Sequence, residues 1–473
     1  MKKNDFLLLS FILTVALLFR LYRINTPLAD LHSWRQVDTA AVARNFVRGG
    51  FDLLHPKYDD FSNVQSGFEN PQGLRMVEFP LYNAIFASMF KYVPVLPIEV
   101  WGRLTSVFFS LIISAIIYYL TLRESGRLAA FFASAIYAAF PFFVFFSRVV
   151  LPETTALGFS FLAIFFLYLN PRSLFLCLIS LLFFASSMLI KPTVIFFGLP
   201  LAYIFYANSP KKFLKNIVFY LFFMLSIIPL FLWRSYIKQF PEGVPVSEWL
   251  ITSVNTSGSL QRIFFKPAFF RWIFFERINN LILGGFTAGF FVIGSLLKKK
   301  RLLLHSILVS SIAFLFVFQG GNVQHEYYQT LILPALAIFS GVGISYFFSL
   351  KKDVVYPNVR NFVIIFLILF SWSISFYKVR DYYNFSPDQV ASAKIINSLT
   401  KINDLVVTDT TGDTTLLYLS DRRGAPSIFK DPETLKELGY DFLVTSSSSE
   451  IDILKSENYS IVFENEKMTI FKL

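Results

Sequence analysis

Long apolar blocks constrain this chain more than any other feature. From residue 6 to residue 377, runs of roughly 17–22 predominantly apolar residues recur, and this is the length an α-helix needs to cross the hydrocarbon of a bilayer. The mean hydropathy is +0.56 and 55% of the residues are hydrophobic. Soluble domains seldom exceed about half apolar residues. The sequence therefore predicts an α-helical polytopic membrane protein.

The basic residues lie in short clusters between these blocks. The net charge of +12 therefore indicates membrane topology rather than a nucleic-acid partner. With Lys2 and Lys3 in the cytoplasm, about eleven spans alternate and keep the basic loops inside. The expected spans are residues 6–22, 100–122, 128–146, 156–170, 174–190, 193–208, 216–233, 281–297, 302–318, 330–350 and 361–377. We expect a multi-pass protein of the cell inner (plasma) membrane, with its first segment retained because Arg20-Leu-Tyr-Arg lacks a small-residue cleavage site.

One apolar stretch, residues 80–94, does not fit the alternation. If it crossed the membrane, every later loop would be inverted and the basic loop 298–301 would lie outside. At about 14 residues the stretch is also short for a crossing. We therefore predict an interfacial helix on the outer face.

Three regions are expected on the outer side. The first long loop is residues 23–99, with helical spacing over 39–47, and the second long loop, residues 234–280, mixes aromatic and basic side chains. These belong to a transmembrane domain at 1–378, followed by an extracytoplasmic α/β domain at 379–473. In that tail, helices at 390–399 and 431–438 alternate with strands at 405–408, 442–445, 460–463 and 468–471. Its expected role is to cover or shape a site, or to bind a partner. The single cysteine, Cys177, excludes an intrachain disulfide.

Polar side chains suited to chemistry gather on the expected outer side. The first long loop carries carboxylate, imidazole, indole and guanidinium groups directly after the first span, and later outer turns add more. The candidates are Asp30, His32, Trp34, Arg35, Asp38, Arg44, Glu78, Arg148, Glu153, Lys191, Arg271, His325, Tyr327 and Tyr328. Each alone has an ordinary explanation: a paired or solvated acid, a snorkelling lysine, or an interfacial tyrosine. Their shared placement at one membrane face predicts a common site.

The order of these elements resembles the GT-C membrane glycosyltransferases over about residues 6–350. The most similar branch is family 39, with the protein O-mannosyltransferases and the bacterial transferases that add aminoarabinose to lipid A. Val77-Glu-Phe-Pro-Leu-Tyr82 is similar to the family's Glu-Lys-Pro-Pro-Leu-Tyr stretch, and 146–153 to its Ser-Arg…Asp turn. Residues 32–39, 325–329 and 418–424 resemble a bacterial subgroup. The family's first-loop Asp-Glu pair is absent, and Phe79 replaces its lysine.

The resemblance implies inverting transfer of a sugar from a polyprenyl-phosphate donor to a hydroxyl of a glycolipid, a cell-envelope glycan such as lipopolysaccharide, or a protein. Catalytic roles fall to Asp38 as general base, with Asp30 second, and to Glu153 and Glu78, which would orient the acceptor or stabilise charge on the sugar ring. Phosphate contacts fall to Arg35, Arg148, Lys191 and Arg271, with His325 as a further donor. Tyr327 and Tyr328 would contact the sugar or prenyl chain, and His32, Trp34 and Arg44 complete the binding set. No cofactor is certain; some relatives hold a divalent metal near the glutamate, which makes Glu78 and His325 metal candidates.

Other functions remain open. A lipid-linked oligosaccharide polymerase or ligase also uses a lipid-linked donor, but it would not need an acidic first loop. A lipid or glycan flippase would place ionisable groups at mid-membrane in pseudo-symmetric halves, whereas mid-span polar groups here are few and no repeat is found. A non-catalytic assembly protein would keep its activity after loss of Asp38. The alternative for Asp38 itself is an N-cap of the helix at 39–46.

Overall fold

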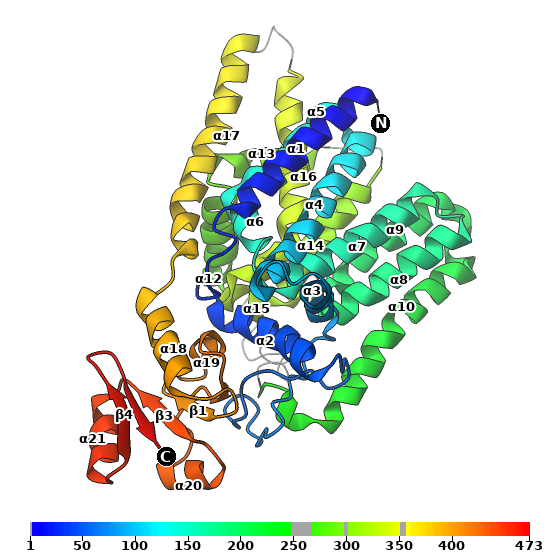
Figure 1. The fold of residues 1–473 in the computed structure, drawn as a ribbon. Coiled ribbons are helices and arrows are strands. Elements are labelled where there is room, and N and C mark those ends of the chain that lie inside the picture. Colours follow the sequence, from blue (N-terminus) through cyan, green and yellow to red (C-terminus); the bar gives the residue numbers. More distant parts are fainter. Residues whose placement is uncertain (1, 247–265, 298–300, 351–355) are drawn as a thin grey trace. The chain divides into compact units, whose positions relative to one another are not determined.

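The apolar blocks fold into helices, and the breaks between helices fall at prolines, glycines and charged turns (Figure 1). The computed structural model describes residues 2–246, 266–297, 301–350 and 356–473. Its contacts divide the chain into two units. The first, the helical unit, comprises 1–24, 103–233 and 250–382, and the second, the mixed unit, comprises 25–102, 234–249 and 383–473.

Each predicted span coincides with at least one helix. The helices that lie wholly or mostly in the helical unit are α1 (Lys3–Leu21), α4 (Ile98–Ser125), α5 (Arg127–Ala139), α6 (Pro141–Phe146), α7 (Pro152–Leu169), α8 (Leu174–Ile190), η1 (Pro192–Phe197), α9 (Gly198–Asn208), η2 (Pro210–Lys215), α10 (Ile217–Tyr236), α12 (Pro267–Phe270), η6 (Arg271–Ile282), α13 (Phe286–Leu296), α14 (Leu303–Val317), α15 (Gln319–Gln324), η7 (Glu326–Ile332), α16 (Leu333–Phe348), α17 (Pro357–Val379) and η8 (Arg380–Tyr383). Within the described ranges, six helices, or up to seven with one bent pair, are long and apolar enough to cross a membrane. Four apolar stretches of 10–17 residues accompany them: 127–139, 174–190, 192–208 and 303–317. The polytopic fold is confirmed, while the number of about eleven spans stays a prediction.

The predicted span at 281–297 is interrupted near its start. Pro267–Ile282 and Phe286–Leu296 meet at an angle of 114°. Gly284 and Gly285 lie at the break with φ of 62° and 88°, a region that side chains rarely adopt. A Cβ atom on Gly284 would also collide with the backbone of Ser371. The aromatic and basic segment before the break therefore turns away from α13.

Contacts at one end of the helical unit join several basic loops. The Arg127 guanidinium donates to Asp5 at 2.6 Å, near the N-terminus. Arg301 lies 3.5 Å from the Glu124 carboxylate, which joins the loop before α14 to the end of α4. These loops are among those that the positive-inside alternation assigns to one side.

The other end of the helical unit holds buried arginines. Arg20 donates to Ser147 at 2.7 Å and to the carbonyls of Tyr137 and Ala138. Arg103 donates to the carbonyl of Ile24 at 2.8 Å. These bonds pair carbonyl oxygens that lack a hydrogen-bond donor within their own helix because the helix ends there.

The tail forms a five-stranded sheet of order β2-β1-β3-β5-β4. β1 (Leu405–Thr408) is parallel to β2 (Arg423–Ala425) and to β3 (Phe442–Thr445), while β5 (Thr469–Lys472) is antiparallel to β3 and to β4 (Ser460–Glu464). Val406 faces the core that includes α18 (Pro387–Leu399) and α19 (Thr415–Leu419), whereas Val407 faces the core that includes α20 (Pro432–Glu437) and α21 (Ser448–Ser456). The predicted α/β domain is confirmed, with β2, α19 and α21 as elements that the sequence did not predict.

The mixed unit joins this sheet to both long loops. Its other helices are α2 (Ser33–Gly49), α3 (Leu81–Tyr92), η3 (Ile237–Gln239) and η4 (Pro241–Gly243). The amide of Phe61 donates to the carbonyl of Gly424 at 2.6 Å, and Gly424 donates back to Asp59 at 2.9 Å. The amide of Met76 donates to Gly243 at 2.6 Å, which ties in the second long loop. The sequence assigned these loops and the tail to separate domains; their contacts place them in one unit.

The stretch 80–94 forms the helix α3 within the mixed unit. Asn83 donates to the carbonyl of Thr39 at 2.6 Å, so α3 packs on α2. Tyr82 donates to the carbonyl of Gly102 at 2.9 Å. With 12 residues, α3 is too short to span the hydrocarbon. Its interfacial position stays a prediction.

Candidate functional site

One cluster of predicted site residues lies around the first turn of α2. Arg35, 4% exposed, donates from Nη2 to Oε1 of Glu78 at 2.6 Å. Gln36 donates to Asp30 at 2.6 Å and to the carbonyl of Leu31. Glu78 keeps 15% of its side chain exposed, whereas Asp30 is 3% exposed. Among the four predicted acids, Glu78 is thus the most accessible to an acceptor.

Two further predicted residues make the turn that begins α2. His32 has a φ of 59°, in the left-handed region, and its carbonyl accepts the first helical bonds from Arg35 and Gln36. Trp34 follows in the first turn. The helix therefore begins at Ser33, rather than near residue 39 as predicted. No apolar periodicity marks 33–38, which is why the sequence missed this turn.

Asp38 lies inside α2, so the interpretation of Asp38 as an N-cap is wrong. Its carboxylate accepts from the Thr414 hydroxyl at 2.6 Å and lies 3.2 Å from Arg75. Asp38 is 1% exposed. Burial raises its pKa, although the charge of Arg75 and the hydrogen bond from Thr414 oppose that rise. This environment favours a structural role, while the role of Asp38 as general base stays a prediction.

The second cluster lies in the helical unit, where α7, α8 and the late loop converge. Glu153 follows Pro152 at the start of α7, and Lys191 ends α8. Lys191 Nζ lies 2.9 Å from Glu153 Oε1 and 5.3 Å from the centroid of the Tyr328 ring. Both charged side chains are nearly buried, with 6% and 2% exposed. In this low-dielectric setting the electrostatic interactions of the pair are little screened by solvent.

The late loop adds stacked rings to this second cluster. The His325 ring stacks on Tyr327 at 5.3 Å with an interplanar angle of 11°. Tyr327 and Tyr328 lie 4.4 Å apart, centroid to centroid. The structure therefore brings together Glu153, Lys191, His325, Tyr327 and Tyr328, as the sequence predicted from their shared membrane face.

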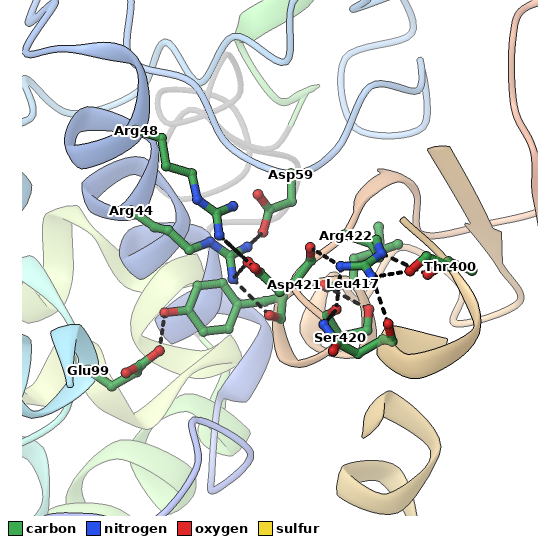
Figure 2. A network of polar contacts seen from close by, with 11 residues as sticks. Arg44, Arg48, Asp59, Glu99, Thr400, Leu417, Ser420, Asp421 and Arg422 are labelled. Carbon is green, nitrogen blue, oxygen red and sulfur yellow. Dashed lines mark hydrogen bonds and ion pairs between the residues drawn. The ribbon is translucent and has the colours of Figure 1, made fainter. Parts of the chain in front are cut away.

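Three predicted arginines have other surroundings. Arg148 is fully buried and donates to the carbonyl of Tyr22 at 2.5 Å. Arg271 is 74% exposed and lies 3.6 Å from Glu276 of its own helix. Both terminal nitrogens of Arg44 contact protein groups, Asp59 and Asp421 (Figure 2). Their phosphate or substrate contacts stay predictions that the geometry does not favour.

Arg277 is the residue of this region that the sequence missed. It lies in the π-helix η6, a rare form that often marks functional sites. It donates to the carbonyls of Asn322 and Val323 and lies 3.6 Å from Glu326. Arg277 thus holds the segment that leads into His325. Its spacing in an amphipathic stretch gave no signal for this contact.

A metal site receives no support from the donor groups. Nowhere in the described ranges do three or more His, Cys, Asp or Glu side chains form a group that could hold a metal ion. Glu78 is paired with the Arg35 cation, which is not the setting of a metal ligand.

Comparison with known proteins identifies the fold. The family model of dolichyl-phosphate-mannose-protein mannosyltransferases matches residues 85–233. ArnT from Cupriavidus metallidurans in the apo state matches with a TM-score of 0.69 at 13% identity, over 98% of this chain and 97% of that chain. The chain has the GT-C fold.

Other GT-C structures agree. ArnT from the same organism bound to undecaprenyl phosphate gives a TM-score of 0.62 at 13% identity, again over 98% of this chain and 97% of that one. The Archaeoglobus fulgidus oligosaccharyltransferase in the apo form gives 0.58 at 13% identity, over 94% of this chain and 70% of that one. No curated protein sequence matches significantly. The shared fold confirms the predicted polytopic membrane architecture, and the family match over residues 85–233 agrees with the predicted glycosyltransferase resemblance.

Proposed function

We propose that this protein transfers a sugar from a polyprenyl-phosphate donor to an acceptor hydroxyl at the extracytoplasmic face of the plasma membrane. The observation that carries the proposal is the match, along nearly the whole chain, to an enzyme that was crystallised with undecaprenyl phosphate. The orientation rests on the basic loops at one end of the helical unit, which the positive-inside rule assigns to the cytoplasm. The acceptor is a glycolipid, an envelope glycan or a protein.

Lys191 is the proposed contact for the donor phosphate. It ends α8 beside Glu153, and the Tyr328 ring covers its ammonium group. Because the lysine is nearly buried, its attraction for a phosphate is less screened than at an exposed site. The neighbouring rings of Tyr327 and Tyr328 would flank the sugar or the first prenyl unit.

Glu78 is the proposed general base, with Asp30 as the second candidate. The base takes the acceptor proton as the acceptor oxygen attacks C1, while the C1–O bond to phosphate breaks and the phosphate leaves with the electron pair. Attack from the face opposite the phosphate inverts C1. Glu78 is favoured because it is the most accessible of the four predicted acids, and because Arg35 fixes the position of its carboxylate at 2.6 Å.

The first test compares two glutamates of the first long loop. Glu78→Gln should lower the transfer rate by about 10²–10⁴-fold, the usual loss for a missing general base, with normal expression. Glu69→Gln is the matched control, because Glu69 is exposed and its carboxylate contacts Lys430 and Asn63. Transfer is measured by mass spectrometry of envelope glycans and polyprenyl-phosphate sugars in cells with each variant. Near-normal transfer by Glu78→Gln would move the base to Asp30 or Asp38.

A lipid-linked oligosaccharide polymerase or ligase is distinguished by the same measurement. Loss of a single sugar from the acceptor indicates the proposed transferase, whereas loss of a whole repeat or chain indicates the alternative.

A further inference from the structure

A short segment of the tail contacts the first long loop at several points. This docking segment comprises residues 414–424, which cover α19 and the start of β2. Its backbone pairs with the first long loop through Gly424, which exchanges hydrogen bonds with Asp59 and Phe61. The pairing places a loop strand along the β2 edge of the sheet, where a free edge would otherwise expose unpaired backbone groups.

Arg44 of α2 is the centre of the contact (Figure 2). It lies 2.5 Å from Asp59 and 2.8 Å from Asp421, and it donates to the carbonyl of Tyr418 at 2.9 Å. The guanidinium also stacks over the Tyr418 ring at 4.1 Å. Only 12% of the Arg44 side chain is exposed. One tail segment thus supplies an anion, a carbonyl and an aromatic face to a single buried cation.

Contacts on either side of Arg44 extend along α2. Near the start of the helix, Thr414 donates to Asp38 at 2.6 Å. Near its end, Arg48 lies 2.6 Å from Asp421. The Tyr418 hydroxyl donates to Glu99 at 2.7 Å, at the beginning of α4. The docking segment therefore holds α2 at three positions along its length and also contacts Glu99, which belongs to the mixed unit.

We propose that the docking segment positions α2 for glycosyl transfer, with Asp421 and Tyr418 as positioning residues. The inference rests on the proposed function, because it concerns the geometry of the proposed base. Arg35 in the first turn of α2 holds Glu78 at 2.6 Å, so a shift of α2 moves the guanidinium away from that carboxylate. Misplacement of a catalytic group by about 1 Å can cost about 100-fold in rate.

The experiment uses the full-length protein and four variants. Asp421→Asn removes the charge that Arg44 and Arg48 share, Asp421→Glu keeps it, and Tyr418→Phe removes only the bond to Glu99. Lys430→Ala is the matched control, because the Lys430–Glu69 pair at 2.7 Å also joins the tail to the first long loop but does not involve α2. Hydrogen exchange of residues 33–49 and the kcat and KM of transfer are measured for each.

We expect Asp421→Asn to speed amide exchange in α2 and to lower kcat at least 10-fold, with the donor KM nearly unchanged. Asp421→Glu should recover most of the wild-type kcat. The kcat of Tyr418→Phe should lie between those of Asp421→Asn and the wild type, and Lys430→Ala should have the wild-type kcat and exchange rates. Faster exchange with unchanged kcat would overturn the positioning role, and unchanged exchange would overturn the anchoring itself. If the wild-type protein transfers no sugar, the proposed function and the positioning role both fail, while the exchange data still decide the anchoring.

Discussion

At the residue scale, the notable groups are charges that the fold buries in pairs. Glu153 and Lys191 are 2% and 6% exposed, and Arg35 is buried against Glu78. A buried pair adds little to stability on its own, because desolvation offsets most of the attraction. Such pairs persist where the charge has a use. In the proposed function, Lys191 binds the donor phosphate and Glu78 accepts the proton of the acceptor.

Replacing Lys191 separates its binding role from its structural one. Lys191→Met leaves Glu153 buried without its cation and should cost about 3–5 kcal/mol of stability. Adding Glu153→Gln removes the unpaired charge and should restore most of the thermal stability, but not the binding of undecaprenyl phosphate. Lys378→Met is the control, since Lys378 lies exposed near the end of α17. Wild-type binding of undecaprenyl phosphate by the stable double variant would show that Lys191 does not contact the phosphate.

Asp60 should make the mixed unit less stable as the pH rises. Burial raises the pKa of Asp60 to about 7, although the Ser62 hydroxyl and amide oppose the rise. Between about pH 4 and pH 7 the folded state holds a proton that the unfolded state has lost, so the free energy of unfolding falls through this window. Asp60→Asn should weaken the loss of thermal stability from pH 5 to pH 8. If the melting temperature of Asp60→Asn falls with pH as steeply as that of the wild type, Asp60 does not titrate in this range.

At the element scale, the break between η6 and α13 depends on two glycines. Gly284→Ala places a methyl group against the Ser371 backbone in a left-handed conformation, so it should destabilise the helical unit by more than about 1 kcal/mol. Gly289→Ala, in α13 with open space at its Cβ, should be neutral or stabilising by about 0.5–1 kcal/mol. Thermal unfolding in detergent compares the two. Equal effects would mean that the bend tolerates a side chain.

The elements that the sequence predicted are those with a strong local pattern. The spans followed from uncharged apolar length, and β1, β3, β4 and β5 from short β-branched or aromatic runs. β2 is only Arg-Gly-Ala, and α19 is five residues long, so neither carries a period that can be read. Both are formed by tertiary contacts with β1, α18 and the first long loop.

The residues of the candidate site could be predicted only where the local sequence pattern places them at one membrane face. Glu153, Lys191 and the late-loop rings were found because span alternation places their loops at one membrane face. The surroundings of Asp38 and Arg44 could not be predicted, because their partners Thr414 and Tyr418 lie 376 and 374 residues away in the sequence. A single sequence gives no signal for such distant pairs. The contacts of Arg277 with the carbonyls of Asn322 and Val323 were not predicted either, because they join segments that lie 45 and 46 residues apart.

At the scale of the whole molecule, the topology can be tested with single cysteines. Val64→Cys and Glu466→Cys, both exposed, should react with an impermeant maleimide from outside the cell. Lys212→Cys should react only after permeabilisation. The variants are made on Cys177→Ala, which removes the one natural thiol. Labelling of Val64→Cys and Glu466→Cys from opposite sides would refute the alternation.

The length of chain between α2 and the docking segment has a consequence for biosynthesis. The contacts of Arg44 and Arg48 join residues 374 and 373 positions apart. At about 5–20 residues per second, a ribosome finishes α2 roughly 20–75 s before it reaches the docking segment. During that interval Asp38, Arg44 and Asp59 have no tail partners, and α2 stays open to proteases. A nascent chain that stops before residue 414 lacks these contacts, so we expect a protease to cleave its first long loop faster than that of the full-length chain.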